Sequence, residues 1–312
     1  VSPHVLKNVF HALTHIKSTE QVLIVVVSKS GSTLETLANF EVIYEHLAER
    51  FPKKLNDRVV AITDRNSRLW AQAKKLDIAV LEIPANVGGR YSVFSSAGLF
   101  PLAMCGVRIA QLVQGAADAV SASLGAKSPA AVIAATTYEH IRQGRPAYNF
   151  FVFNPELATL GRWLRQLTGE SIGKEGKGIL PTVSIGTTDL HSVGQLYFQG
   201  PNNILTHFIF AKSTDQISVP QTTLFEPIDA MMESRHVEDI RTAIYEGTKK
   251  AYRDAQLPYL ETRLTDVTAY SLGYVMQQQM ITTMYIAYLM GVNAFDQPGV
   301  EAYKAAAREL LK

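Results

Sequence analysis

Hydroxyl groups are concentrated in one short segment, Ser-Lys-Ser-Gly-Ser-Thr at residues 28–33. The segment follows an apolar run at 22–27 that is typical of a buried strand, and it precedes helical apolar spacing over 34–50. Hydroxyls and backbone N–H groups at the positive end of a helix dipole bind phosphate readily. The same residues are also ordinary helix N-caps, and the local sequence supports both interpretations equally.

A second candidate site contains a permanent charge beside two glycines, Gly88-Gly89-Arg90. Paired glycines let a backbone approach a ligand closely, and the guanidinium stays charged at any physiological pH. A turn with a surface arginine explains the same residues, and the local pattern by itself favours that interpretation.

Glu170 lies four residues after Gln166, so both share one face if the helix predicted over 158–167 continues. Glycines at 169, 173, 176 and 178 predict that the helix ends there in a loop. A carboxylate at a helix end beside such a loop could act as a general base. Most glutamates at helix ends are simply solvated, and this remains the default from spacing alone.

Histidine and lysine supply the remaining candidates. His191 follows a strand predicted over 180–185, where an imidazole suits acid–base chemistry. Asp189 could orient that ring, or it could be a helix cap. Gln297 and Lys304 are seven residues apart, about two turns of a helix predicted over 298–311.

Alternating elements must position these residues. Strands at 22–27, 59–63 and 78–83 alternate with helices at 34–50 and 69–76, which predicts a parallel, doubly wound sheet. After a mainly helical stretch at 96–143, a second α/β block begins. Its predicted strands are 148–153, 180–185 and 204–210, and its predicted helices are 158–167, 237–255, 266–290 and 298–311.

Composition excludes several classes of protein. The 312 residues are 47% apolar and 19% charged, a globular rather than a disordered balance. Thirty basic against twenty-eight acidic residues require neither a nucleic acid nor an anionic membrane as partner. The longest apolar runs fall short of the roughly 20 residues that span a bilayer. A single cysteine, Cys105, excludes an intrachain disulfide and a cysteine-rich metal site, and it indicates a cytoplasmic location.

Five segments together resemble the phosphoglucose isomerase family. In chain order they are SKSGSTLET (28–36), GGRYSVFSSAGL (88–99), QLTGESIGK (166–174), DLHSVGQL (189–196) and FDQPGVEAYK (295–304). Any one would be modest support, but five in the family's order are highly specific. The resemblance implies two flavodoxin-like sugar-isomerase domains with parallel sheets, the first incomplete, and long C-terminal helices. We expect boundaries at 1–112, 113–290 and 291–312, the last being an active-site helix.

The resemblance implies interconversion of glucose 6-phosphate and fructose 6-phosphate through a cis-enediolate, a step of glycolysis and gluconeogenesis that needs no metal or cofactor. Glu170 would be the base, Arg90 would stabilise the enediolate oxygen, and His191 and Lys304 would open the sugar ring. In the family the histidine comes from the neighbouring subunit of a homodimer. The implied ligands of the phosphate and sugar hydroxyls are Ser28, Lys29, Ser30, Thr33, Gln166 and Gln297.

The chain also departs from the family pattern. The family's first sheet begins upstream with a strand and a glycine-rich loop that has no counterpart here, so we expect an N-terminally truncated isomerase with weak or no activity. A different class of function, a non-catalytic phosphosugar-binding regulator, would need the hydroxyl loop but not Glu170, His191 and Lys304 together.

Overall fold

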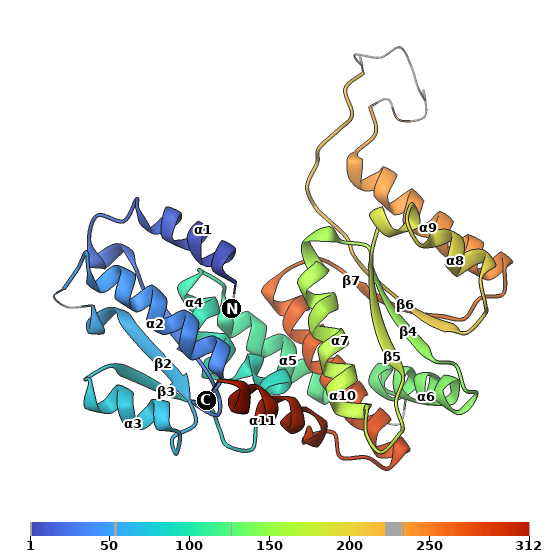
Figure 1. The fold of residues 1–312 in the computed structure, drawn as a ribbon. Helices are drawn as coiled ribbons and strands as arrows, with labels where there is room; N and C mark the ends of the chain where they lie inside the picture. Colours follow the sequence, from blue (N-terminus) through green and yellow to red (C-terminus); the bar gives the residue numbers. More distant parts are fainter. Residues whose placement is uncertain (1, 53–54, 126, 222–231, 233, 312) are drawn as a thin grey trace. The chain divides into compact units, whose positions relative to one another are not determined.

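The computed structural model describes residues 2–52, 55–125, 127–221, 232 and 234–311. The chain divides into two compact units, Val1–Ile109 and Ala110–Lys312. Each unit contains a parallel sheet with helices on both faces, the α/β class that the strand and helix alternation predicts (Figure 1). Across the described residues, none of the helices combines the length and apolar character needed to cross a membrane.

The first unit is built on a three-stranded parallel sheet of order β1-β2-β3. Helices α2 and α3 cover one face through Phe40 and Leu69, and α4 covers the other through Phe100. The elements are α1 Pro3–Leu13, β1 Ile24–Val27, α2 Leu34–Ala48, β2 Val59–Thr63, α3 Arg68–Lys75, β3 Ala79–Glu82 and α4 Ser96–Met104.

One strand prediction for this unit needs correction. The run at 22–27 was expected to be a strand buried on both faces, but β1 is shorter and only Val26 is fully buried, because β1 lies at the edge of the described sheet. All five residues of the central strand β2 are buried instead. The first helix covers Pro3–Leu13 and is capped by the Ser2 side chain.

The second unit has a four-stranded parallel sheet of order β5-β4-β6-β7. Helices α6, α7 and α10 pack on one face around Phe150 and Leu164, and α8 and α9 pack on the aromatic other face around Phe208. Its elements are α5 Ile109–Ser123, α6 Pro129–Arg142, β4 Ala147–Val152, α7 Ala158–Ile172, β5 Leu180–Ile185, α8 Gly194–Gln199, β6 Ile204–Ala211, α9 Val237–Asp254, β7 Tyr259–Leu264, α10 Ala269–Met290 and α11 Glu301–Leu310.

Several differences from the predicted elements have local causes. The helical stretch at 96–143 divides into α4, α5 and α6, with left-handed Gly106 after α4. Strand β7 was missed because its sequence carries Glu261 and Arg263, whose charges pair with side chains of α9. The last helix begins at Glu301, since residues 298–300 form a 3₁₀ turn.

A buried polar chain crosses the second sheet. His207 on β6 is fully buried, its Nδ1 2.7 Å from the Tyr148 hydroxyl of β4 and its Nε2 2.7 Å from Thr262 Oγ1 of β7. Burial lowers the pKa of His207 to about 3, so the ring is neutral at physiological pH. These bonds tie three strands together inside the core of the second unit.

Candidate active site

The hydroxyl segment lies at the carboxyl edge of the first sheet. Ser28 is buried at the end of β1, and its Oγ lies 2.9 Å from Thr33 Oγ1. Because Thr33 is engaged there, its side chain does not cap α2, which starts at the next residue. Thr33 therefore leaves the first N–H groups of α2 without a side-chain cap. Within the same loop, Ser30 Oγ accepts a hydrogen bond from the Ser32 hydroxyl at 3.1 Å.

The turn that follows β2 packs against the hydroxyl loop and holds it in place. The Thr63 hydroxyl, at the end of β2, donates to the Ser28 carbonyl at 2.6 Å and lies 2.8 Å from Ser67 Oγ. Gly31 has a φ of +61°, and a Cβ built on it would lie 2.7 Å from Ser67 Cβ. The loop is thus held by its neighbour in one conformation that requires glycine. Sequence reasoning missed Thr63 and Ser67, although a hydroxyl at a strand end and a helix-capping serine were both visible.

Arg90 lies beyond the same edge of the first sheet, after β3. It belongs to a 3₁₀ segment, Gly89–Phe94, and is only 2% exposed, so the surface-arginine interpretation is wrong. Its guanidinium carbon lies 5.2 Å from the centre of the Tyr91 ring, a cation–π distance. Because β1 and β3 flank β2 in a parallel sheet, Arg90 and the hydroxyl loop follow strands that end at one edge.

Gln166 and Glu170 share a helical face, because α7 continues to Ile172 rather than stopping at 167. Gln166 Nε2 donates to Glu170 Oε1 at 3.1 Å. Gly169 does not end the helix, since Thr168 and Ser171 on either side of it are buried and hold the last turn against the unit. The amide orients the carboxylate, as a general base requires.

His191 is exposed in the turn that follows β5. Asp189 holds that turn: its Oδ2 accepts from the Ile185 N–H at 2.7 Å and its Oδ1 accepts from the Ser192 hydroxyl at 2.9 Å. Asp189 therefore fixes the backbone on which His191 stands, by bonding the end of the strand to the residue after the histidine.

Glu170 and His191 lie at opposite ends of the parallel strands in the second sheet. Helix α7 follows β4 and runs back along it (Figure 1). Glu170 is twelve residues into this helix and therefore lies about 18 Å from its start, on the side of the unit where β5 begins. His191 comes after the far end of β5, whose six residues span about 17 Å. The structure does not bring these two candidates together within one unit.

Gln297 and Lys304 come after α10, which also runs back along the sheet and ends at Met290. Gln297 precedes the 3₁₀ turn Pro298–Val300, and Lys304 lies in the first turn of α11. Lys304 Nζ pairs with Glu301 Oε1 at 2.8 Å, and this pairing lowers the pKa of Glu301. The chain order thus places Gln297 at the same end of the second sheet as Glu170, where the parallel strands begin.

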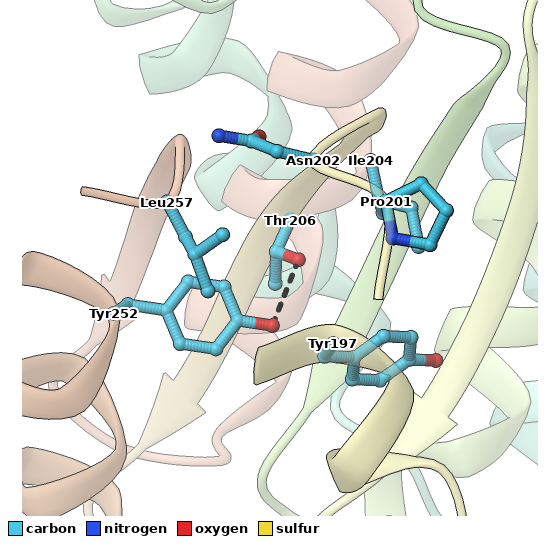
Figure 2. A pocket seen from close by; sticks show the side chains of 7 residues that line it. All are labelled: Tyr197, Pro201, Asn202, Ile204, Thr206, Tyr252 and Leu257. Carbon is cyan, nitrogen blue, oxygen red and sulfur yellow. Dashed lines mark hydrogen bonds between the residues drawn. The ribbon is translucent and has the colours of Figure 1, made fainter. Parts of the chain in front are cut away.

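A small cavity lies at the amino end of β6, on the aromatic face (Figure 2). Its volume of about 10 Å³ is enough for one water molecule and far too small for a sugar phosphate. The Tyr252 hydroxyl lies 3.2 Å from Thr206 Oγ1 there, and burial raises the pKa of Tyr252 to about 12. The lining residues are Tyr197, Pro201, Asn202, Ile204, Thr206, Tyr252 and Leu257.

Comparison with known proteins agrees with the motif order. The chain is 34% identical over 309 residues to the glucose-6-phosphate isomerase of Levilactobacillus brevis, covering 96% of this chain and 68% of that protein. It is 36% identical over 298 residues to the glucose-6-phosphate isomerase of Enterococcus faecalis, covering 92% and 65%. The chain therefore spans about two thirds of the length of these relatives.

Solved structures share the fold. A hypothetical protein from Thermus thermophilus superposes with a TM-score of 0.92 at 30% identity, covering all of this chain and 75% of that one. A glucose-6-phosphate isomerase from Chlamydia trachomatis has the same fold, with a TM-score of 0.82 at 20% identity, covering 98% and 62%. The family model described as phosphoglucose isomerase matches residues 4–312, and with these relatives it shows that the chain belongs to the phosphoglucose isomerase family.

Proposed function

We propose that the protein interconverts glucose 6-phosphate and fructose 6-phosphate, with Glu170 as the base. The observation that carries this assignment is the pairing of Gln166 with Glu170 on one face of α7, inside a chain that belongs to the family. A regulator that only binds phosphosugars needs no oriented carboxylate, which favours the enzyme over that alternative. We propose a cytoplasmic location, because the chain carries a single cysteine.

The reaction moves one proton between neighbouring carbons of the open-chain sugar. Glu170 removes the proton from C2 of glucose 6-phosphate, and the carbonyl oxygen on C1 gains charge as the cis-enediolate forms. Arg90 stabilises that oxygen, electrostatic work that buried, preorganised charges perform well. Glu170 then returns the proton to C1 while the hydroxyl proton on O2 leaves and O1 gains one, giving fructose 6-phosphate.

The other candidates bind the substrate or prepare it. Ser28, Lys29, Ser30 and Thr33 hold the phosphate with hydroxyl and backbone donors, and Gln166 and Gln297 orient phosphate or hydroxyl groups. His191 and Lys304 open the sugar ring by moving a proton between the ring oxygen and the C1 hydroxyl. The substrate arrives mainly as a ring, so this step precedes proton abstraction.

We further propose a homodimer in which His191 acts in the site of the partner subunit. The support is the placement of Glu170 and His191 at opposite ends of the parallel strands of one sheet, which leaves the two groups too far apart for one sugar. In addition, no residue of α11 is buried, and Tyr303 and Leu310 on it are exposed apolar surface. Sedimentation at several protein concentrations tests this directly: a single monomeric species at all of them contradicts the dimer.

The activity is tested by coupling glucose 6-phosphate formation from fructose 6-phosphate to its dehydrogenase and following NADPH. The Levilactobacillus brevis relative serves as positive control for the assay. We expect the wild-type protein to turn over only weakly, and we expect even this weak turnover to be lost in Glu170→Gln, which keeps the shape of the side chain. Binding of fructose 6-phosphate without turnover in the wild type favours the regulator instead.

A further inference from the structure

The end of α7 is followed by a tight hairpin that carries two lysines. Lys174 and Lys177 pair through their backbones, with N···O distances of 3.1 and 2.8 Å in the two directions. Between them, Glu175 and Gly176 have φ values of +55° and +72°, the pattern of a two-residue type I′ turn. The turn fixes both lysines only a few residues beyond Glu170.

The two side chains contact different targets near the end of α10. Lys177 Nζ donates to the carbonyl of Met290, the last residue of the helix, at 3.0 Å, and its side chain is 47% exposed. The Lys174 side chain is only 8% exposed, and its Nζ donates to the carbonyl of Asn293 and pairs with Asp296 Oδ1 at 2.7 Å. Lys174 thus reaches past the helix to the segment that follows it.

That segment is itself ordered around the same carboxylate. Asn293 Nδ2 donates to Asp296 Oδ2 at 3.0 Å, and Asn293 Oδ1 accepts from the Phe295 N–H at 3.0 Å. Asp296 therefore pairs with Lys174 through one carboxylate oxygen and accepts a hydrogen bond from the Asn293 amide on the other. Gln297 is the next residue in the chain. A buried ammonium is stable only with such partners, so the lysine and the segment hold each other in place.

We propose that Lys174 is a positioning residue that fixes the segment leading to Gln297 and Lys304 against the end of the helix that carries Glu170. The base and the groups that orient and open the sugar must act on one substrate, and a shift of about 1 Å in such groups can cost about 100-fold in rate. The effect on turnover rests on the proposed function, whereas the structural restraint does not.

The first test measures the restraint without any activity. Hydrogen exchange is compared between the wild type, Lys174→Met and the matched control Lys177→Met, which removes the neighbouring lysine of the same hairpin. We expect amides in 292–300 to exchange faster in Lys174→Met by about tenfold or more, with β4 amides unchanged, and no such change in Lys177→Met. Unchanged exchange in 292–300, or equal acceleration in β4, overturns the proposal.

The second test measures catalysis in the same three proteins with fructose 6-phosphate. We expect kcat to fall about tenfold or more in Lys174→Met while KM changes less than about threefold, because the hydroxyl segment at 28–33, which supplies most of the proposed phosphate ligands, is undisturbed. Lys177→Met should keep the wild-type kcat. A wild-type kcat in Lys174→Met with accelerated exchange refutes the positioning role. If the wild type neither binds nor turns over fructose 6-phosphate, the proposed function is refuted, and the exchange result still decides the restraint.

Discussion

Gly31 provides a sharp test of the hydroxyl loop as a phosphate site, through the substitution Gly31→Ala. Its φ of +61° is one that alanine adopts at a cost of about 1–2 kcal/mol. The added Cβ would also lie 2.7 Å from Ser67 Cβ, about 0.7 Å inside the 3.4 Å at which ordinary contact begins. Ser67 is held by Thr63 and caps α3, so the loop must move instead.

The same chain offers a matched control. Gly106 also has a positive φ, +81°, but a Cβ there meets nothing within 4 Å. Gly106→Ala therefore carries the backbone cost without the collision, and both sites lie in the first unit. The extra effect of Gly31→Ala measures the displacement of the loop alone.

A loop shifted by several tenths of an ångström lengthens the hydrogen bonds to a bound phosphate. We expect the Kd of fructose 6-phosphate, measured by titration calorimetry, to rise about tenfold in Gly31→Ala, which is about 1.4 kcal/mol of binding free energy. Gly106→Ala should bind like the wild type. Equal affinity in the two variants would refute the loop as the phosphate site.

Three further predictions concern the second unit. Glu170→Gln should lower kcat by about 10³-fold with the Kd of fructose 6-phosphate nearly unchanged, and a fall in binding instead would make Glu170 a ligand rather than the base. Asp189→Ala removes the acceptor that fixes the His191 turn, so kcat should fall about tenfold at constant Kd; an unaltered kcat shows that the turn holds without it. The pKa of His207 is about 3 in the folded protein and about 6.5 in the unfolded chain. Between these pH values the unfolded chain therefore binds more protons than the folded protein. The free energy of unfolding should fall by up to about 1.4 kcal/mol per pH unit as the pH drops from 6.5 toward 3. The free energy of unfolding, measured by urea titration at several pH values in that range, should depend less on pH in His207→Gln than in the wild type. An identical pH dependence would contradict the assignment.

Some elements could be predicted because local sequence and tertiary burial agree. Val59–Thr63 matches its predicted bounds because it is a run of strand-forming residues between turn residues. Leu180–Ile185 also matches its predicted bounds although it contains Pro181, because it pairs with β4 along its whole length. Helix α7 outlasts its prediction because burial of Ser171 and Ile172 outweighs the helix-breaking tendency of Gly169. Strand β7 could not be predicted because its charged residues Glu261 and Arg263 break the apolar strand pattern, and their partners on the preceding helix α9 come close only in the folded chain.

The site shows the same division. The candidate site residues were identifiable by type, but the residues that hold them in place were not, because Thr63, Asp189 and Lys174 act through contacts that only the folded chain creates. Likewise, the separation of Glu170 from His191 follows from helix and strand direction, which the motif order does not reveal.

The most direct test of the central claim mixes two inactive proteins, Glu170→Gln and His191→Ala, after subunit exchange. If each site takes Glu170 from one subunit and His191 from the other, half the sites of a mixed dimer contain both wild-type residues. Random mixing then restores about one quarter of wild-type turnover, because about half of the dimers are mixed. Turnover no higher than that of the separate variants would contradict a site shared between two subunits.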